Sequence, residues 1–137
     1  MECLIVIGNT KTSFKLGFGF TLIELLVVMA VIAVLLTLAL PKYFGSIEKS
    51  KEAALQQDLS VMRDSIDKYY GDTGKYPKSL EDLAIKHYLK VIPVDPITES
   101  AETWVTFPPA EVSKGNVYDV KSGSNLKSST GKPYSEW

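Results

Sequence analysis

The chain has 137 residues, the length of one domain, and its 15 basic and 16 acidic residues give a formal net charge of −1. This balance argues against a nucleic-acid-binding protein, because such proteins normally carry a strong basic excess. The single cysteine excludes an internal disulfide and a cysteine-based zinc cluster, and the single histidine makes a histidine-dependent catalytic site hard to build.

Residues 20–40 form a strongly apolar run with one charged residue, Glu24. A helix of this length would be about 31 Å long, which matches the hydrocarbon core of a membrane. Pro41 follows directly and is expected to stop or kink that helix. Residues 1–19 precede it and have the character of a leader peptide. Thr21 and Thr37 can each donate a hydrogen bond to a carbonyl of the preceding turn, so the presence of these two residues does not by itself indicate a function.

Residues 42–71 are polar, with an apolar residue at every third or fourth position. This spacing predicts an amphipathic helix, and the residues on its apolar face are expected to pack on a core: Leu55, Leu59, Met62, Ile66 and Tyr69. The glycines of the segment 71–74 are expected to end the helix. The surrounding charges are mostly a solvated face, and a subset is placed for contacts between neighbouring heads: Lys42, Glu48, Lys49, Lys51 and Glu52.

In the remaining residues, 72–137, the spacing of the apolar residues changes more often, which indicates several short elements. Ser79 with Asp82 three positions later predicts an N-cap and a short helix from Leu80 to about His87. Residues 103–107 and 116–120 are typical of β-strands. The segment 121–134 is rich in serine and glycine and predicts a loop, and Trp137 is expected to return to the core. The pattern as a whole indicates an α+β fold in which a long N-terminal helix packs on a small head with a short helix and a short antiparallel sheet.

Four tyrosines gather in sequence around the end of the long helix. We expect them to form a packed seam of the core beside Trp104: Tyr69, Tyr70, Tyr76 and Tyr88. His87 is expected to cap or flank the short helix. The chain has no nucleophile elbow, no P-loop, no cysteine pair and no second histidine, so no enzymatic site is indicated.

The segment from Gly19 to Leu26, followed by the apolar run and Pro41, resembles the type IV pilin class, which includes pilins and the pseudopilins of type II secretion systems. Further segments are similar to the major, G-type pseudopilin of type II secretion: residues 59–83, 88–90, 92–96, 118–120, 122–124 and 135–137. The resemblance implies a type IV pilin-like fold, with a transmembrane and filament-core helix over 20–40 and a periplasmic head over 41–137.

The resemblance implies that a prepilin peptidase removes residues 1–19 by cutting between Gly19 and Phe20, and that Phe20 is then N-methylated. The bond after Gly17 is also a glycine–aromatic bond, but only the cut after Gly19 makes Glu24 the fifth residue of the product. Glu24 would then pair with the Phe20 amine of a neighbouring subunit during assembly. The alternatives are an uncleaved signal anchor and an interfacial charge without a role in assembly.

Pro41 also has two interpretations. The resemblance implies that the helix near Pro41 loosens on assembly, and the alternative is a simple kink at the membrane surface.

The function implied is a structural subunit that polymerises into a periplasmic filament of a type II secretion system. The expected partners are other copies of the chain, the prepilin peptidase, an inner-membrane assembly platform, minor pseudopilins and, before assembly, membrane lipid, with no nucleic acid among them. The expected location is the bacterial inner membrane, as a single-pass protein with a periplasmic C-terminal head. Two alternatives remain: a type IV pilus subunit used for adhesion, motility or DNA uptake, and a membrane-anchored periplasmic module that does not polymerise.

The C-terminal loop of the resembled family often binds calcium through aspartates. Residues 122–137 contain no aspartate, and calcium prefers six to eight oxygen ligands, several of them carboxylates. Only weak ligand candidates remain, namely Ser122, Ser124 and Glu136, so no cofactor is expected.

Overall fold

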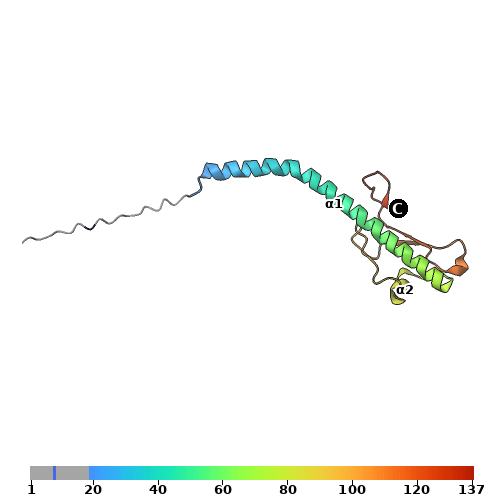
Figure 1. Cartoon of the computed structure of the whole chain (residues 1–137). Coiled ribbons are helices and arrows are strands. Elements are labelled where there is room, and N and C mark those ends of the chain that lie inside the picture. Colours follow the sequence, from blue (N-terminus) through green and yellow to red (C-terminus); the bar gives the residue numbers. More distant parts are fainter. Residues whose placement is uncertain (1–7, 9–18) are drawn as a thin grey trace, which may run out of the picture. The chain divides into compact units, whose positions relative to one another are not determined.

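The computed structural model describes residues 8 and 19–137, so the predicted leader lies outside the described residues except for Gly8 and Gly19. The elements follow in the order α1 (Leu22–Thr73), α2 (Leu80–Ile85), β1 (Val105–Phe107), η1 (Val112–Lys114), β2 (Asp119–Lys121) and η2 (Tyr134–Glu136) (Figure 1). Contacts divide the chain into two compact units, Met1–Ala39 and Leu40–Trp137. The second unit is the head.

Helix α1 contains Pro41 and continues through it. Of the two predicted effects of Pro41, a stop or a kink, the stop is therefore wrong. A proline inside a helix removes one backbone hydrogen bond, and the helix tolerates this loss here. Helix α1 ends at Thr73, two residues later than predicted. Gly74 follows with φ 71°, and its N–H donates to the carbonyl of Tyr70 at 2.8 Å. This left-handed glycine is the expected C-terminal cap.

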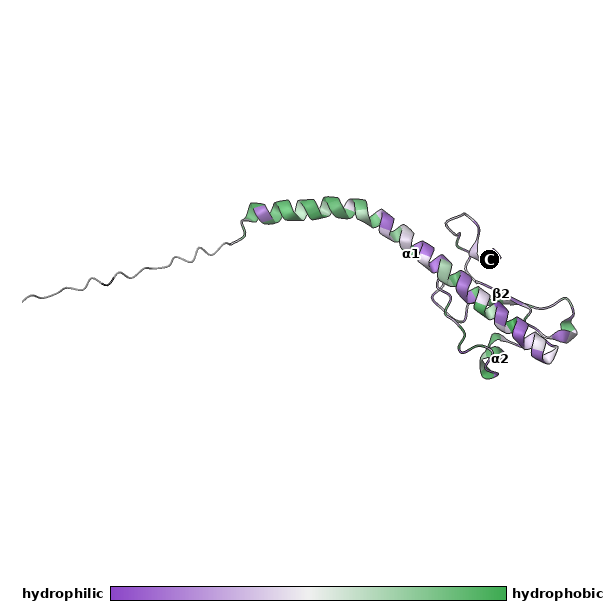
Figure 2. Ribbon diagram, viewed as in Figure 1, coloured by the Kyte–Doolittle hydropathy of each residue, from purple (hydrophilic) through white to green (hydrophobic). Residues whose placement is uncertain are grey.

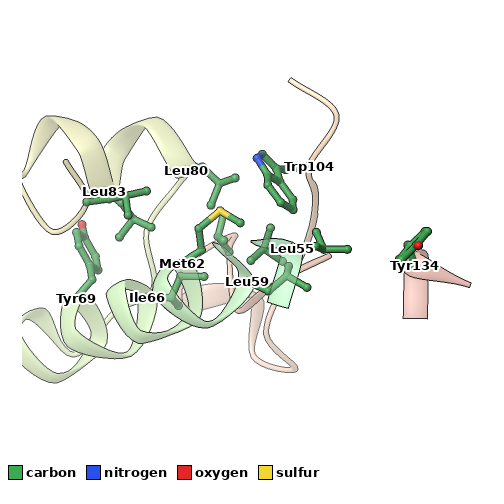
Figure 3. Close-up of a cluster of buried hydrophobic side chains, with 12 residues drawn as sticks. Leu55, Leu59, Met62, Ile66, Tyr69, Leu80, Leu83, Trp104 and Tyr134 are labelled. Carbon is green, nitrogen blue, oxygen red and sulfur yellow. The ribbon is translucent and has the colours of Figure 1, made fainter. Parts of the chain in front are cut away.

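The core of the head lies on the C-terminal half of α1. All five residues of the predicted apolar face are buried, as the spacing requires. Seven buried residues from the rest of the head complete the cluster: Leu80, Leu83, Leu89, Trp104, Val117, Val120 and Tyr134 (Figure 3). The helix therefore supplies one wall of the core, and the segments that follow it supply the other.

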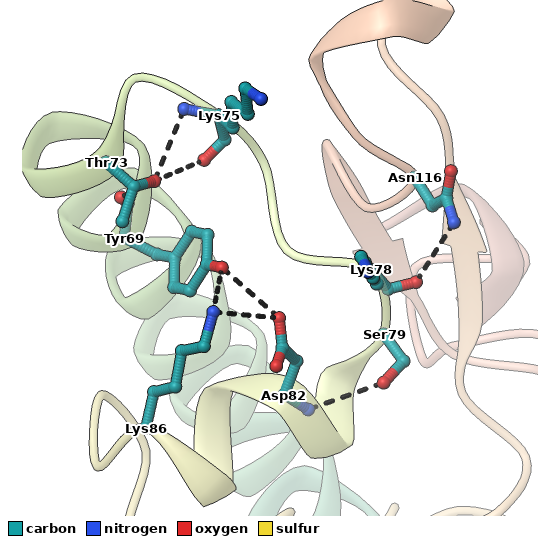
Figure 4. A network of polar contacts seen from close by, with 8 residues as sticks. All are labelled: Tyr69, Thr73, Lys75, Lys78, Ser79, Asp82, Lys86 and Asn116. Carbon is teal, nitrogen blue, oxygen red and sulfur yellow. Dashed lines mark hydrogen bonds and ion pairs between the residues drawn. The ribbon is translucent and has the colours of Figure 1, made fainter.

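Helix α2 begins with the predicted N-cap, because the Ser79 hydroxyl accepts a hydrogen bond from the Asp82 N–H at 3.3 Å. It ends at Ile85, earlier than predicted, and His87 flanks it with φ 63°. A polar network ties the two helices together (Figure 4): Lys86 donates to the Tyr69 hydroxyl at 2.6 Å, and that hydroxyl lies 3.2 Å from the Asp82 carboxylate. The hydrogen bond to Tyr69 raises the pKa of Lys86.

Strands β1 and β2 pair antiparallel, with Thr106 opposite Val120, and confirm the predicted sheet. Both strands are shorter than predicted, and β2 extends to Lys121. Two short 3-10 helices, η1 and η2, were not predicted: η1 lies between the strands, and η2 begins at Tyr134, where the sequence predicted a loop. Trp137 packs against the core as expected, with its ring 5.2 Å from that of Tyr134.

The predicted tyrosine seam is confirmed in part: Tyr69 belongs to the core, and Tyr76 and Tyr88 pack against it, but the rings form two separate groups. Tyr69 and Tyr88 pack edge to face at 5.2 Å beside the core. Tyr70 stacks on Tyr76 at 4.4 Å, and Tyr76 contacts Tyr118 at 5.4 Å. Adjacent residues of a helix point about 100° apart, so Tyr69 and Tyr70 cannot share one seam.

Candidate functional site

The start of α1 carries the predicted processing and assembly residues. Gly19 and Phe20 precede the helix and are exposed. The Glu24 N–H donates to the Thr21 hydroxyl at 3.2 Å, and the Thr21 N–H donates to the Glu24 carboxylate at 3.5 Å. This reciprocal pair is a capping box, which satisfies two backbone donors that the first turn leaves free. Thr21 therefore acts as an N-cap, and the prediction of a hydrogen bond to a preceding carbonyl is wrong for Thr21. The prediction is confirmed for Thr37, whose hydroxyl donates to the Ala33 carbonyl at 2.8 Å.

Residues 22–40 of α1 are apolar except for Glu24 and Thr37, and this part of the helix is almost entirely green in Figure 2. An 18-residue window of the helix has a mean hydropathy of 2.9, and none of that window is buried in the chain, so the helix is long and apolar enough to span a membrane. Such an all-round apolar helix is stable only when lipid or other protein covers it. A carboxylate placed in a bilayer costs about 2.5–3.5 kcal/mol, so Glu24 is the one expensive residue of the segment.

The weak calcium candidates do not form one site. The Ser122 hydroxyl donates to the Asp95 carboxylate at 2.5 Å, and the Ser124 N–H donates to the Ser122 oxygen at 3.2 Å. Glu136 instead lines a groove of about 660 Å³ with Arg63 and Trp137. Residues 8 and 19–137 contain no group of three His, Cys, Asp or Glu side chains that could hold a metal.

Asp95 organises this part of the head, and the sequence pattern did not single it out. Its carboxylate accepts hydrogen bonds from the N–H groups of Ile97 and Thr98, at 2.8 and 3.4 Å, besides that from Ser122. The side chain is fully buried. Burial, and next the nearby Asp95 carboxylate, raise the pKa of Asp58. The signal that could have found Asp95 is its place between two prolines ahead of Thr98, a pattern typical of a side-chain-capped turn.

The C-terminal loop should keep its folded structure without bound calcium. Removal of divalent cations by a chelator, or addition of calcium, is expected to leave the melting temperature of the head unchanged, because Asp95 and Ser122 satisfy each other and the loop lacks the carboxylates that calcium needs. Differential scanning calorimetry with chelator and with added calcium checks this. A calcium-dependent rise in melting temperature that magnesium does not reproduce would contradict it.

Two charged residues of α1 hold the C-terminal segment. Glu52 accepts hydrogen bonds from the Ser129 N–H at 2.6 Å, the Ser129 hydroxyl at 2.8 Å and the Tyr134 hydroxyl at 3.0 Å. Arg63 donates to Asp119 at 2.8 Å and to the main-chain oxygens of Val120 and Trp137 at 3.1 and 2.9 Å. These contacts tie segments far apart in the sequence to the central helix.

Glu52, one of the charges expected to serve contacts between heads, thus binds its own chain. Lys51 likewise contacts Glu99 of its own head at 3.3 Å. The hydrogen bonds from Ser129 lower the pKa of Glu52. Burial, and then the bond to Glu52, raise the pKa of Tyr134 to about 12.

Glu52→Gln should weaken the head by about 1 kcal/mol at neutral pH, because a charged acceptor is lost from three hydrogen bonds. A carboxylate whose pKa is lowered by folding stabilises the native state above its ordinary pKa of 4.5, and this contribution is lost as the pH falls through the lowered value. The variant should therefore lose less stability than the wild type on acidification. Urea unfolding at several pH values measures this, with Glu111→Gln, at an exposed position, as control.

The sequence is similar to one family model and to several curated proteins. Residues 18–40 match the prokaryotic N-terminal methylation motif. The chain is 34% identical to type II secretion system core protein G of Klebsiella pneumoniae over 65 residues, 47% of this chain and 46% of the relative. It is 31% identical to core protein G of Escherichia coli over 94 residues, 57% of this chain and 65% of the relative. It is also 36% identical to the fimbrial protein EcpC of Eikenella corrodens over 59 residues, 43% of this chain and 39% of that protein.

These matches span roughly half the length of the curated relatives. No solved structure matches the chain significantly. The helix with its methylation motif and the small α+β head agree with the sequence matches, and the family they indicate is structural rather than enzymatic. The chain thus carries the methylation motif at the start of a pilin-like α+β fold, and over about half of its length it is distantly similar to type II secretion system core protein G.

Proposed function

We propose that the chain is a pseudopilin, a subunit that is cut between Gly19 and Phe20, N-methylated at Phe20 and polymerised into a periplasmic filament of a type II secretion system. The observation that carries this proposal is the capped start of α1, where Glu24 follows Gly19 by five positions and opens the apolar segment that matches the methylation motif. The similarity to core protein G over about half of the chain supports the choice of machine.

The apolar half of α1 has two successive roles in this proposal. It first anchors the subunit in the inner membrane, with the head in the periplasm, and lipid covers its exposed side chains. It then packs against other copies in the filament, where the new amine of Phe20 on a neighbour pairs with Glu24. Two opposite charges brought together in an apolar core offset much of the desolvation cost of each. Pro41 lies at the end of the segment, where a missing backbone hydrogen bond makes the helix easier to loosen.

The partners follow from these steps. They are the prepilin peptidase, inner-membrane lipid, an assembly platform, minor pseudopilins and further copies of this chain. The chain brings no nucleotide-binding motif, so another protein must supply the energy for assembly.

The test of processing is the intact mass and the N-terminal fragment spectrum of protein extracted from native membranes. We expect a chain that begins at N-methylated Phe20. A chain that retains Gly19, or that begins after another residue, would contradict the proposal and favour the non-polymerising membrane-anchored module.

A type IV pilus subunit is the second candidate, and the similarity to the fimbrial protein EcpC favours it. Deletion of the gene separates the two: loss of export of folded proteins supports the secretion filament, and loss of surface pili with normal export supports the pilus. Paired cysteines at Met29 and Leu36 test polymerisation in either case, because both side chains are exposed in the apolar segment and a filament should give a ladder of crosslinked species.

A further inference from the structure

The apolar face of α1 continues beyond the part that the head covers. The first buried residue of the helix is Leu55. Phe44 lies eleven positions earlier, which is just over three full turns, and therefore on the same face. Leu40, Lys51 and Met62 are likewise spaced eleven positions apart and lie on one face of the helix. Residues 40–51 thus present a stripe in phase with the core, and the head reaches only its last turn, where Lys51 contacts Glu99.

Two exposed aromatic rings lie on this uncovered segment. Tyr43 and Phe44 are 63% and 60% exposed, and their ring centroids are 6.1 Å apart at an edge-to-face angle. Among the residues that the structure describes, neither ring has an aromatic contact other than the one with its neighbour. Rings in such a position are stable only where another medium or molecule takes up their apolar surface.

The charge of the same segment has the opposite sign to that of the rest of the head. Residues 42–51 carry three lysines and one glutamate, whereas residues 52–137 carry ten basic and thirteen acidic residues. A positive segment on an otherwise negative head favours contact with a negative surface. Lys42 and Lys49 are exposed and lie seven positions apart, on one face of the helix.

We propose that residues 40–51, the basic–aromatic segment, lie in the headgroup layer of an anionic phospholipid membrane and set the depth at which the unassembled subunit is held. The inference rests on the proposed membrane anchoring of residues 20–40. Tyrosine rings favour the headgroup level, where the apolar body meets the acyl chains and the hydroxyl stays wet. Lysine stems bury along apolar surface and place their ammonium groups beside lipid phosphates.

Lipid fits this segment better than the face of a second copy. The segment directly follows the apolar run that fits a hydrocarbon core, so its position in the chain is that of the headgroup layer. An identical copy would also bring its own lysines close to these, and like charges repel across an interface. The combination of lysine, tyrosine and phenylalanine suits a boundary between oil and water.

The test uses the full chain with Cys3→Ser and Ser46→Cys, labelled at residue 46 with an environment-sensitive fluorophore and reconstituted in vesicles. Lipids with a nitroxide near the headgroup serve as quenchers. In vesicles of phosphatidylethanolamine and phosphatidylglycerol we expect strong quenching, and in phosphatidylcholine vesicles weaker quenching. Tyr43→Ser with Phe44→Ser should abolish most of it. Each of Lys42→Gln and Lys49→Gln should lower the ratio of embedded to water-exposed label about fivefold in anionic vesicles only.

Val61→Ser is the matched control, because Val61 is an exposed apolar residue of the same helix within the covered region. Unchanged quenching in the aromatic and lysine variants would overturn the proposal, as would quenching that depends on protein density rather than on lipid, since the latter would assign the segment to a second copy. Extraction of the unaltered chain by alkaline carbonate would instead overturn the membrane anchoring itself, which separates the two failures.

Discussion

Glu24→Ala should remain in the membrane and be cut after Gly19, but should fail to polymerise. In the proposed filament, removing the carboxylate would take away the partner of the Phe20 amine and leave that charge uncompensated in the core. Breaking a buried ion pair in this way costs about 3–5 kcal/mol, which corresponds to a loss of at least a hundredfold in the affinity of each subunit for the filament end. Insertion should become easier, because the only charge of the apolar segment is gone. The readout is the crosslinking ladder from cysteines at Met29 and Leu36.

Thr21→Ala is the matched control for this variant. It breaks the capping box but keeps the carboxylate, so it separates capping of the helix from pairing between subunits. We expect a loss of about 1 kcal/mol in helix stability and a ladder close to that of the unaltered chain. Loss of the ladder in both variants would assign Glu24 to the capping of its own helix, and a normal ladder from Glu24→Ala would refute the pairing with Phe20.

Asp95→Ala should destabilise the head by about 3 kcal/mol, the largest effect expected in the folded core. The variant leaves the Ser122 hydroxyl and the N–H groups of Ile97 and Thr98 without their buried acceptor, and each unsatisfied group costs about 1–3 kcal/mol. The release of Asp58 from a neighbouring negative charge offsets a small part of this. Urea unfolding followed by the tryptophan fluorescence of Trp104 and Trp137, which both lie in or against the core, measures the change.

Asp95→Asn and Glu102→Ala complete the test. The amide retains one oxygen for the turn, so its loss should be smaller than that of the alanine variant. Glu102 is exposed and lies nearby in the sequence, so its removal should change stability by less than about 0.5 kcal/mol. A decrease in the free energy of unfolding below about 1 kcal/mol for Asp95→Ala would mean that water replaces the carboxylate and that Asp95 is not important for the stability of the head.

The parts of the fold that could be predicted are those that depend on local spacing. The apolar stripe of α1, the Ser79 cap and the glycine end of the helix each follow from residues three or four positions apart, and the structure confirms them. The same holds for the approximate position of the two strands.

The contacts that could not be predicted join residues far apart in the chain. Glu52 and Ser129 are 77 positions apart, and nothing in the neighbourhood of either indicates the other. Asp95 lies among prolines and has the sequence character of a turn residue, so its burial depends on Ser122. The closeness of the tyrosines in the sequence favours one seam, but neighbouring helix positions point in different directions.

The order in which the chain is made gives the distribution of the core a further consequence. Ribosomes release the N-terminal residues first, so α1 emerges with Leu55, Met62 and Ile66 while Val117, Val120 and Tyr134 are still to be made. These late residues cover the helix stripe, and contacts at such long sequence separation form slowly. The apolar stripe of α1 therefore stays exposed until the end of synthesis. Until then, a chaperone that binds exposed apolar helices would protect the subunit from premature association.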